Sequence, residues 1–356
     1  MAAAAGPLVI AAALSQTPDA GARCSASWEP PRPPGPATSA RLAALTEPAL
    51  AVFDNAAATA ERHPDTFPTG PTEAIFCSLY GPGGAVGEVA SAVEEDNYAL
   101  RSDEDESDFW GFAQEAGGLF TPSEDGLRQV ELLGCSPRGA LLTCLDHLGR
   151  RRATAGSAHL AFLDTEGVEM GSYFVSNVTA TAAKPSPRGD GLLDVTVRLW
   201  CDELLPGSAW VWELLRTGQL DRKGLWHSLD PEGRRAWLSV ALWSRHYQRR
   251  EHPEDAAPGE VFTLDGRQVV DADSFYCALG EAINGSGGYF GWNLAAVDDC
   301  LRGRFGATPP FTLEWQNSDI ARSQLAGGQA SDRDTGADFD VLLEIFTDHG
   351  IDVLLR

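Results

Sequence analysis

The hydrophobic and polar positions divide this chain of 356 residues into stretches of different character. Over residues 71–205, short β-branched and aromatic runs are separated by Gly, Pro and Asp, which predicts a β-rich domain with a mainly antiparallel sheet. The acidic run Glu94–Asp108, between the first two strands, is expected to be a solvated loop. The predicted strands are Ile75–Tyr80, Gln129–Leu133, His159–Leu163, Tyr173–Thr181 and Leu192–Trp200.

The stretches on either side of this β-rich domain have other patterns. Residues 1–70 combine dense proline with weak periodicity, which predicts a disordered or low-complexity segment. Residues 206–251 are rich in Trp at helical spacing, so we expect helices that pack on the β-rich domain and an N-terminal unit of α+β class. The first helix should bury a face made by Trp210, Leu214 and Leu215. The second should begin at the N-cap and N1 pair Asp230-Pro231 and bury Trp237, Val240, Ala241 and Trp243.

A linker is predicted over residues 252–259, which contain two prolines and a glycine, and residues 260–356 follow as a second domain. Short strands alternate with helices there, so we predict an α/β fold with a small parallel sheet and crossover helices. Its first helix should be capped by Asp273 and bury Phe275, Ala278, Leu279, Ala282 and Ile283. Its strands are predicted at Val261–Leu264, Phe311–Trp315 and Ile351–Leu355.

The net charge of −24 limits the classes of partner. RNA, DNA and anionic membrane surfaces repel an acidic protein, so neither nucleic acid nor a membrane is expected as a direct partner. The acidity is densest at the C-terminal end, where residues 260–356 hold 16 acidic and 6 basic side chains, a net charge of −10. This charge favours a basic protein as partner, and the alternative is that it only keeps the chain in solution.

Metal, cofactor and catalytic chemistry have no support in the sequence. The seven cysteines are scattered without a C-x-x-C pair, and the histidines do not cluster with acids or cysteines, so we expect no metal and no cofactor. Such cysteines are typical of buried residues in a reducing compartment. Met1–Leu14 lacks the basic region of a signal peptide, and we expect a cytoplasmic protein. Ser172, His159 and Asp164 lack the Gly-x-Ser-x-Gly context of a nucleophile, so no catalytic residue and no enzyme are predicted.

The helix that starts near Asn293 is the most informative element for function. Its core-facing positions, at i, i+3 and i+7, are Leu294, Val297 and Leu301. Its opposite face therefore carries Ala295, Asp298, Asp299 and Arg302. Just before the helix, Tyr289 and Phe290 stand next to glycines that allow a sharp turn. Carboxylates beside aromatic side chains are typical of a protein-binding patch, and the alternative is a solvated helix face.

The run Gly288–Leu301, GYFGWNLAAVDDCL, resembles the signature of the barstar family, the intracellular inhibitors of the ribonuclease barnase. The resemblance covers residues 260–356, and its further elements occur in the family's order: Asp265-Gly266, Phe311–Trp315 and Gly350–Leu355. The whole chain is also similar to long two-domain barstar-like proteins of actinobacteria, through segments such as Gly171–Phe174 and Trp237–Trp243.

The resemblance implies a mechanism, in which an acidic helix and the loop before it plug the cleft of a basic ribonuclease or ribonuclease-type toxin. Carboxylates take the place of RNA phosphates, and Asp299 matches the aspartate that fills the phosphate site. Tyr289 matches the loop aromatic that lies over the enzyme's site. The implied ribonuclease-binding residues are Tyr289, Phe290, Gly291, Asn293, Asp298, Asp299, Gly303, Glu344 and Asp348.

This chain departs from the family pattern on the same face. Ala295 stands where the family has a second aspartate, and Arg302 and Arg304 place positive charge where a basic enzyme would approach. The alternative is therefore a non-inhibitory protein–protein interaction module that keeps the barstar-like fold. Such a module would dock on another protein, or on residues 72–250 of the same chain. The sequence leaves the oligomeric state open.

Overall fold

The structure of the protein is a computed structural model, in which the chain divides into two units, Met1–Gly84 and Ala85–Arg356. Every residue that the structure describes belongs to the second unit. The described residues are 96–150, 153–326 and 337–356. The predictions that lie outside them concern the segment 1–70, the strand Ile75–Tyr80, Cys24 and Cys77.

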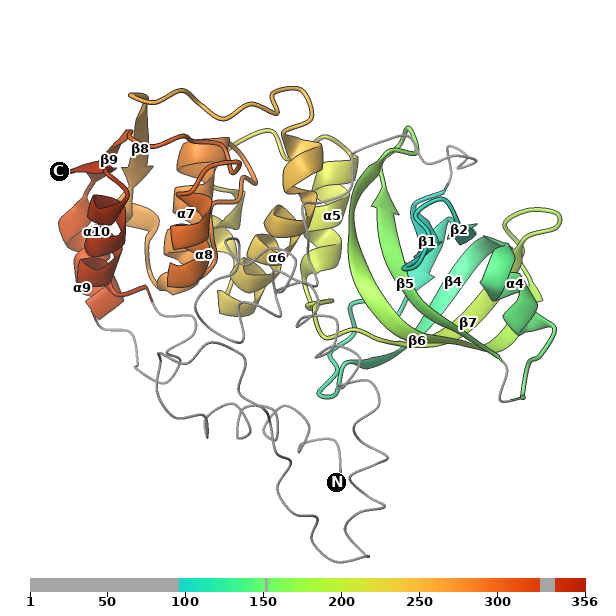
Figure 1. Ribbon diagram of the computed structural model, residues 1–356. Coiled ribbons are helices and arrows are strands. Elements are labelled where there is room, and N and C mark those ends of the chain that lie inside the picture. Colours follow the sequence, from blue (N-terminus) through green and yellow to red (C-terminus); the bar gives the residue numbers. More distant parts are fainter. Residues whose placement is uncertain (1–95, 151–152, 327–336) are drawn as a thin grey trace, which may run out of the picture. The chain divides into compact units, whose positions relative to one another are not determined.

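The first part of the described chain forms one antiparallel sheet of seven strands (Figure 1). The strand order is β2-β1-β5-β6-β7-β4-β3, and a further pairing of β2 with β4 closes the sheet on itself. The elements are β1 (Tyr98–Ser102), β2 (Phe109–Ala113), β3 (Glu115–Gly117), β4 (Leu127–Pro137), α4 (Gly139–Leu145), β5 (Thr154–Leu163), β6 (Glu169–Pro185) and β7 (Leu193–Trp200). The predicted antiparallel class is confirmed, and β4 to β7 contain the four predicted strands that can be compared.

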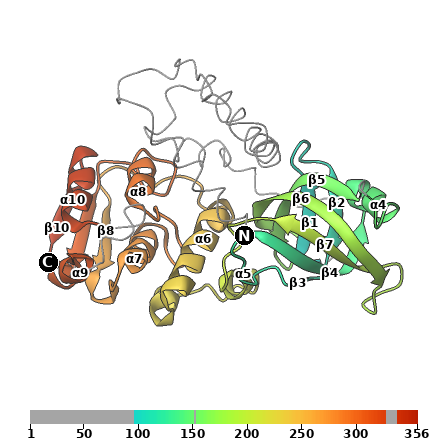
Figure 2. The same cartoon turned by 90° about the horizontal axis from the view of Figure 1, so that it is seen from below.

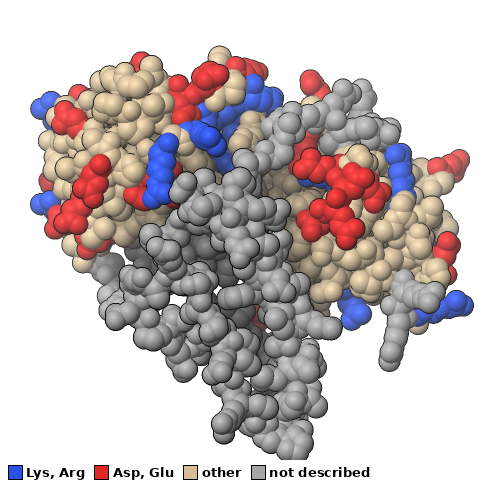
Figure 3. Space-filling view, viewed as in Figure 1, with Lys and Arg blue, Asp and Glu red and all other residues tan. Residues whose placement is uncertain are grey.

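The solvated loop predicted over Glu94–Asp108 is wrong in its first half, because β1 lies inside it. Ala99 and Leu100 are buried, since β1 pairs with β2 on one side and with β5 on the other. The turn from Asp103 to Asp108 is exposed, and Figure 3 shows acidic side chains gathered over β1 and β2. A strand this short gives too few alternating positions to stand out among acidic neighbours.

Two helices follow the sheet, α5 (Ser208–Arg216) and α6 (Pro231–Gln248), with a short 3-10 helix, η2 (Leu225–Ser228), between them. Asp230 caps α6 as predicted, because its Oδ1 accepts a hydrogen bond from the Gly233 amide at 2.8 Å. The face predicted for α5 is only partly right, because Leu214 is buried but Trp210 is 44% exposed. Trp212 faces the sheet instead and stacks on Phe162 with ring centroids 4.4 Å apart.

One side of α6 packs on β6. The predicted inward residues Trp237, Val240 and Ala241 are all buried. Trp243 lies against Tyr173 of β6, with ring centroids 5.7 Å apart. The hydroxyl groups of Tyr173 and Ser239 of α6 are 3.3 Å apart, within hydrogen-bond distance. This side of the helix therefore buries its aromatic residues against the sheet.

The last part of the chain forms a three-stranded parallel sheet in the order β10-β9-β8, which confirms the predicted α/β class (Figure 1). Crossover helices connect the strands, because parallel neighbours cannot be joined by a tight turn. The elements are β8 (Val261–Asp265), η3 (Gly266–Gln268), α7 (Ala272–Asn284), α8 (Leu294–Cys300), β9 (Thr312–Gln316), α9 (Ser318–Ala326), α10 (Phe339–Asp348) and β10 (Asp352–Leu355).

Helix α7 lies between β8 and α6 and is buried on two sides (Figure 2). Its N-cap is Asp271 and not the predicted Asp273, since the Asp271 carboxylate accepts from the Ser274 amide in a capping box. Phe275 stacks on Trp315 of β9, whereas Cys277 faces α6 with its Sγ 4.0 Å from the Arg234 carbonyl oxygen. The predicted stripe is only partly right, because Ala278, Ala282 and Ile283 are half-buried.

The described cysteines fit the prediction of small buried residues. They are free and buried, and they are Cys135, Cys144, Cys201, Cys277 and Cys300. Among the described residues, no helix is long and apolar enough to cross a bilayer. The domain boundaries after residues 70, 205, 251 and 259 stay predictions.

Candidate functional site

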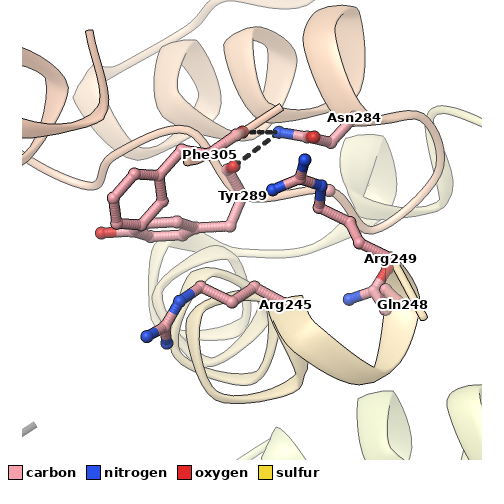
Figure 4. A pocket seen from close by; sticks show the side chains of 7 residues that line it. Arg245, Gln248, Arg249, Asn284, Tyr289 and Phe305 are labelled. Atoms are coloured by element: carbon pink, nitrogen blue, oxygen red, sulfur yellow. Dashed lines mark hydrogen bonds between the residues drawn. The ribbon is translucent and has the colours of Figure 1, made fainter. Parts of the chain in front are cut away.

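The loop between α7 and α8 contains several of the predicted site residues, and Asn284 holds it in place. The Asn284 side chain donates two hydrogen bonds, to the carbonyl oxygens of Tyr289 at 2.8 Å and Phe305 at 2.7 Å (Figure 4). Gly291 has a φ of 96°, and a Cβ there would lie 2.6 Å from Cγ2 of Val297. The loop therefore needs glycine at this position to pack against α8.

Asn293 and Gly303 set the two ends of α8. The Asn293 Oδ1 accepts a hydrogen bond from the Ala296 amide at 2.7 Å, so Asn293 is the N-cap of the helix that the sequence predicts to start near this residue. Val297 and Cys300 anchor the helix in the core. After the helix, Gly303 turns the chain with a φ of 96°, and its amide donates to the Cys300 carbonyl oxygen at 3.2 Å. These two residues therefore fix where the acidic residues of α8 lie.

Replacing Asn293 with alanine is expected to lower the free energy of unfolding by about 1 kcal/mol, because the Ala296 amide loses its cap. Asn293→Ser is the matched control, since serine caps helices about as well as asparagine. Urea denaturation of the full chain measures both variants. An alanine variant as stable as the serine variant would contradict the capping role.

Asp298 and Asp299 lie on the face of α8 away from the core, and both are already paired. Asp298 accepts a hydrogen bond from Arg302 and forms another with Nε2 of His349 at 2.7 Å. An oxygen of Asp299 is 3.6 Å from Nη1 of Arg302. The charge of Arg302 therefore lies between the two carboxylates, at the position where the sequence predicts that it opposes a basic enzyme.

The two carboxyl groups differ in pKa. Burial opposes the ionisation of Asp298, but hydrogen bonds with His349 and Arg302 outweigh it and lower the pKa of this group. Burial raises the pKa of Asp299, and the charge of Arg302 offsets this only in part. The two side chains are 35% and 31% exposed, so a partner can reach both. A further cationic partner would therefore stabilise the ionised form of Asp299 more than that of Asp298.

The last helix adds two acidic residues near α8. Glu344 and Asp348 are exposed and stand one turn apart on α10. The next residue, His349, bonds Asp298, so the end of α10 lies beside α8. The structure therefore places all four predicted carboxylates on two neighbouring helices. We call this set the acidic edge; its members are Asp298, Asp299, Glu344 and Asp348.

The segment that carries this loop, the acidic edge and the parallel sheet matches a known family. Residues 259–352 match the family Barstar (barnase inhibitor). The segment is a barstar-type domain. The resemblance predicted from the sequence is therefore confirmed for this part of the chain, and the domain is of a protein–protein interaction type. No curated protein matches the sequence of the chain.

Most of the aromatic loop of the barstar-type domain, residues 287–292, is buried, and only Trp292 is partly exposed. Tyr289 and Phe290 are 4% and 0% exposed. The rings of Tyr289 and Phe305 lie 6.3 Å apart, and the guanidinium of Arg245 of α6 is 5.8 Å from the Phe305 ring (Figure 4). Burial also raises the pKa of Tyr289. In this structure a partner does not reach the Tyr289 ring, because side chains of α6 line the same small cavity.

Helix α6 turns basic side chains toward the barstar-type domain. We call them the arginine face; they are Arg234, Arg235, Arg245 and Arg249. Arg234 forms an ion pair with Asp271. Arg235 pairs with Asp273 at 3.2 Å and lies over the Trp292 ring at 4.4 Å. Arg249 pairs with Asp255 at 2.7 Å and donates to the Arg304 carbonyl oxygen at 3.0 Å.

The sequence contains a signal for this contact that the predictions missed. At about 100° per residue, Arg234, Arg245 and Arg249 fall on one side of α6, opposite Trp243 and Tyr247. A helix with one aromatic side and one basic side is typical of an element that contacts two different surfaces. The acidic domain that follows in the chain is the natural complement of the basic side.

The other groupings in the sequence do not form a site. His159 pairs with Asp103 at 3.2 Å. The Asp164 carboxylate accepts from the Tyr247 hydroxyl at 2.7 Å and from the Val168 amide at 2.8 Å, so it does not orient a histidine. Within the part of the chain that the structure describes, no three His, Cys, Asp or Glu residues are placed to hold a metal ion.

Proposed function

We propose that this chain is an immunity-type inhibitor that binds a basic ribonuclease, or a ribonuclease-type toxin, through the acidic edge. The observation that carries the proposal is the carboxylate pair Asp298 and Asp299, held on a capped helix in a domain of the barnase-inhibitor family. Asp299 takes the place of an RNA phosphate, and Glu344 and Asp348 add negative charge from α10. The chain performs no catalysis in this proposal. It acts in the cytoplasm, where buried free cysteines stay reduced.

The charges of the domain support a basic partner. Opposite unit charges 4 Å apart attract by about 1 kcal/mol in water and by more where water is excluded. In the free protein, Arg302 forms ion pairs with Asp298 and Asp299, but its side chain is 53% exposed. Exposed pairs at i, i+4 contribute only about 0.3–0.5 kcal/mol, so a basic partner readily competes with Arg302.

In this proposal, the remaining predicted contact residues act by positioning α8 and the loop before it. Asn293 and Gly303 set the ends of α8, and Gly291 lets the loop pack against it. Tyr289 and Phe290 are buried, so their effect on binding is expected through the position of the loop. The proposal includes no direct contact with nucleic acid or with a membrane.

An inhibition assay tests the proposal. The purified full chain is added at micromolar concentration to barnase and to the basic ribonucleases encoded in the same genome, with RNA cleavage as the readout. We expect stoichiometric loss of activity for at least one enzyme, and weaker inhibition as salt screens the charges. If every enzyme cleaves RNA at its normal rate, the inhibitory function is wrong.

The raised pKa of Asp299 makes binding depend on pH. The ionised carboxylate binds a cationic partner, and it is lost as the pH falls through this raised pKa. Affinity should therefore begin to fall at a pH above the ordinary aspartate value of about 3.9. The measurement is the dissociation constant for the inhibited ribonuclease over an acidic pH series. Asp299→Asn should remove this part of the dependence, whereas Asp319→Asn, at an exposed position of α9, should keep it.

A second candidate is a non-inhibitory interaction module, and one observation favours it. The loop that resembles the ribonuclease-binding loop of the family is covered by α6 of the same chain. For this second candidate, the function of the barstar-type domain is to bind the preceding helices of the same chain. The two candidates differ in one result, because only the inhibitor loses affinity for a ribonuclease when Asp299 is removed.

A further inference from the structure

Helix α6 connects two surfaces of the same chain. Its aromatic side packs on β6 through Tyr173 and Trp243, while the arginine face contacts the barstar-type domain. Residues just before α6 also contact that domain. The Gly224 amide donates to Glu281 of α7 at 2.8 Å, and the Ser286 hydroxyl donates to the Arg222 carbonyl oxygen at 2.6 Å. The aromatic loop therefore lies against a basic helix and the segment that leads into it.

The arginine face makes the same kinds of contact with the barstar-type domain that a separate basic protein would make. Arg235 combines an ion pair with a cation–π contact to Trp292, the pairing by which basic side chains bind aromatic surfaces. Gln248 donates to the Gly287 carbonyl oxygen at 3.0 Å. A Cβ at Gly287 would lie 2.3 Å from Leu220, so the loop fits this neighbour closely. Arginine, aromatic and backbone contacts thus cover the loop together.

One basic side chain of this contact, Arg245 in the last turn of α6, has a less favourable environment than the others. Arg245 has no ion pair with a carboxylate that the structure describes, and its guanidinium donates to the Leu242 carbonyl oxygen of its own helix. Burying a charge without an opposite charge is unfavourable. The ion pairs are at the two ends of α6, with Asp271 and Asp273 at one end and Asp255 at the other. Arg245 is stabilised only by the Leu242 carbonyl oxygen and the Phe305 ring, and we expect such a contact to open more easily than an apolar core.

We propose that the arginine face of α6 covers the aromatic loop of the same chain. A basic protein must displace this face of α6 to reach Tyr289. The proposal rests on the proposed inhibitory function and adds its regulation. While α6 is docked, the ribonuclease meets only the acidic edge. When α6 is released, the loop and the acidic edge act together and the affinity rises.

The test compares three variants of the full chain with the wild type. Arg235→Glu breaks the contacts with Asp273 and Trp292. Arg304→Glu is the control for charge alone, because it makes the same change in charge through an exposed side chain where a basic enzyme would approach. Arg235→Glu with Asp273→Arg restores an ion pair of reversed sign and shows whether the effects of the single variant come from the loss of this pair. The readouts are amide hydrogen exchange over residues 285–306 and affinity for barnase as the probe.

We expect Arg235→Glu to speed exchange over residues 285–306 and to raise the affinity for barnase about tenfold above that of Arg304→Glu, equivalent to about 1.4 kcal/mol. The double variant should return both readouts toward the wild type. Unchanged exchange in Arg235→Glu overturns the inference, and so does faster exchange with equal or lower affinity. If neither the wild type nor Arg235→Glu binds barnase, the proposed function fails for this probe. The exchange result then still decides whether the arginine face holds the loop closed.

Discussion

Replacing Trp237 with alanine should lower the free energy of unfolding by about 3–5 kcal/mol, the range for large aromatic residues removed from a core. Trp237 is fully buried in α6, the helix that contacts both β6 and α7. The indole Nε1 has no hydrogen-bond partner among the described residues, so the loss is one of packing and of burial from water. The cavity would weaken both surfaces of α6 at once.

Trp210→Ala is the matched control for this prediction. The two rings are neighbours, with centroids 6.2 Å apart, but Trp210 is 44% exposed. Its removal leaves a space that water can fill, and the expected loss is about 1 kcal/mol. Urea denaturation of the full chain gives both values. Equal losses from the two variants would mean that α6 is not the packed centre that the structure describes.

Replacing Asp299 with alanine should weaken binding of the inhibited ribonuclease about 30-fold, or by about 2 kcal/mol, the scale of one charge-assisted hydrogen bond. Asp299 has the greater effect because its only ion pair in the described structure is the distant one with Arg302, at 3.6 Å. Asp298 is held by both Arg302 and His349, so Asp298→Ala should cost less affinity. The measurement is a titration of ribonuclease activity with each variant.

Asp319→Ala controls for the loss of one negative charge from the same domain. Asp319 is exposed in the first turn of α9, outside the acidic edge. Its removal should change affinity only through long-range charge, which physiological salt largely screens beyond about 8 Å. The leading role of Asp299 is excluded if Asp319→Ala and Asp299→Ala weaken binding equally while both variants keep the wild-type melting temperature.

The fold was predictable from the sequence wherever the pattern of apolar and polar residues fits only one type of element with one buried face. Four strands of the antiparallel sheet and the strands of the parallel sheet were found, because each is a long run or is closed by a clear turn. Strand β1 was missed because its two buried apolar residues, Ala99 and Leu100, stand in an acidic run. The inward face of α5 was misassigned because Trp210 and Trp212 are equally hydrophobic, and only the stacking of Trp212 on Phe162 separates them.

The candidate site was predictable to a smaller degree. The positions of the two acids of α8 follow from helical spacing, and the structure places both on the side of the helix away from the core. The pairing of Asp298 with His349 joins residues 51 positions apart, so no local pattern could predict it. The burial of Tyr289 depends on α6 in the same way, since Arg245, Gln248 and Arg249 line the same cavity and come from more than 35 residues earlier in the chain.

The sequence by itself determined the two fold classes, the barstar signature and the concentration of acidic charge after residue 260. These are properties of neighbouring residues, and periodicity, composition and motif report them directly. Only the tertiary structure decided which surface of the barstar-type domain is covered, because that depends on where the path of the chain brings α6. The sequence of α6 is the same whether its arginine side chains face water or form ion pairs with aspartates of the next domain. The contacts of Arg234 with Asp271 and of Arg235 with Asp273 supply that answer.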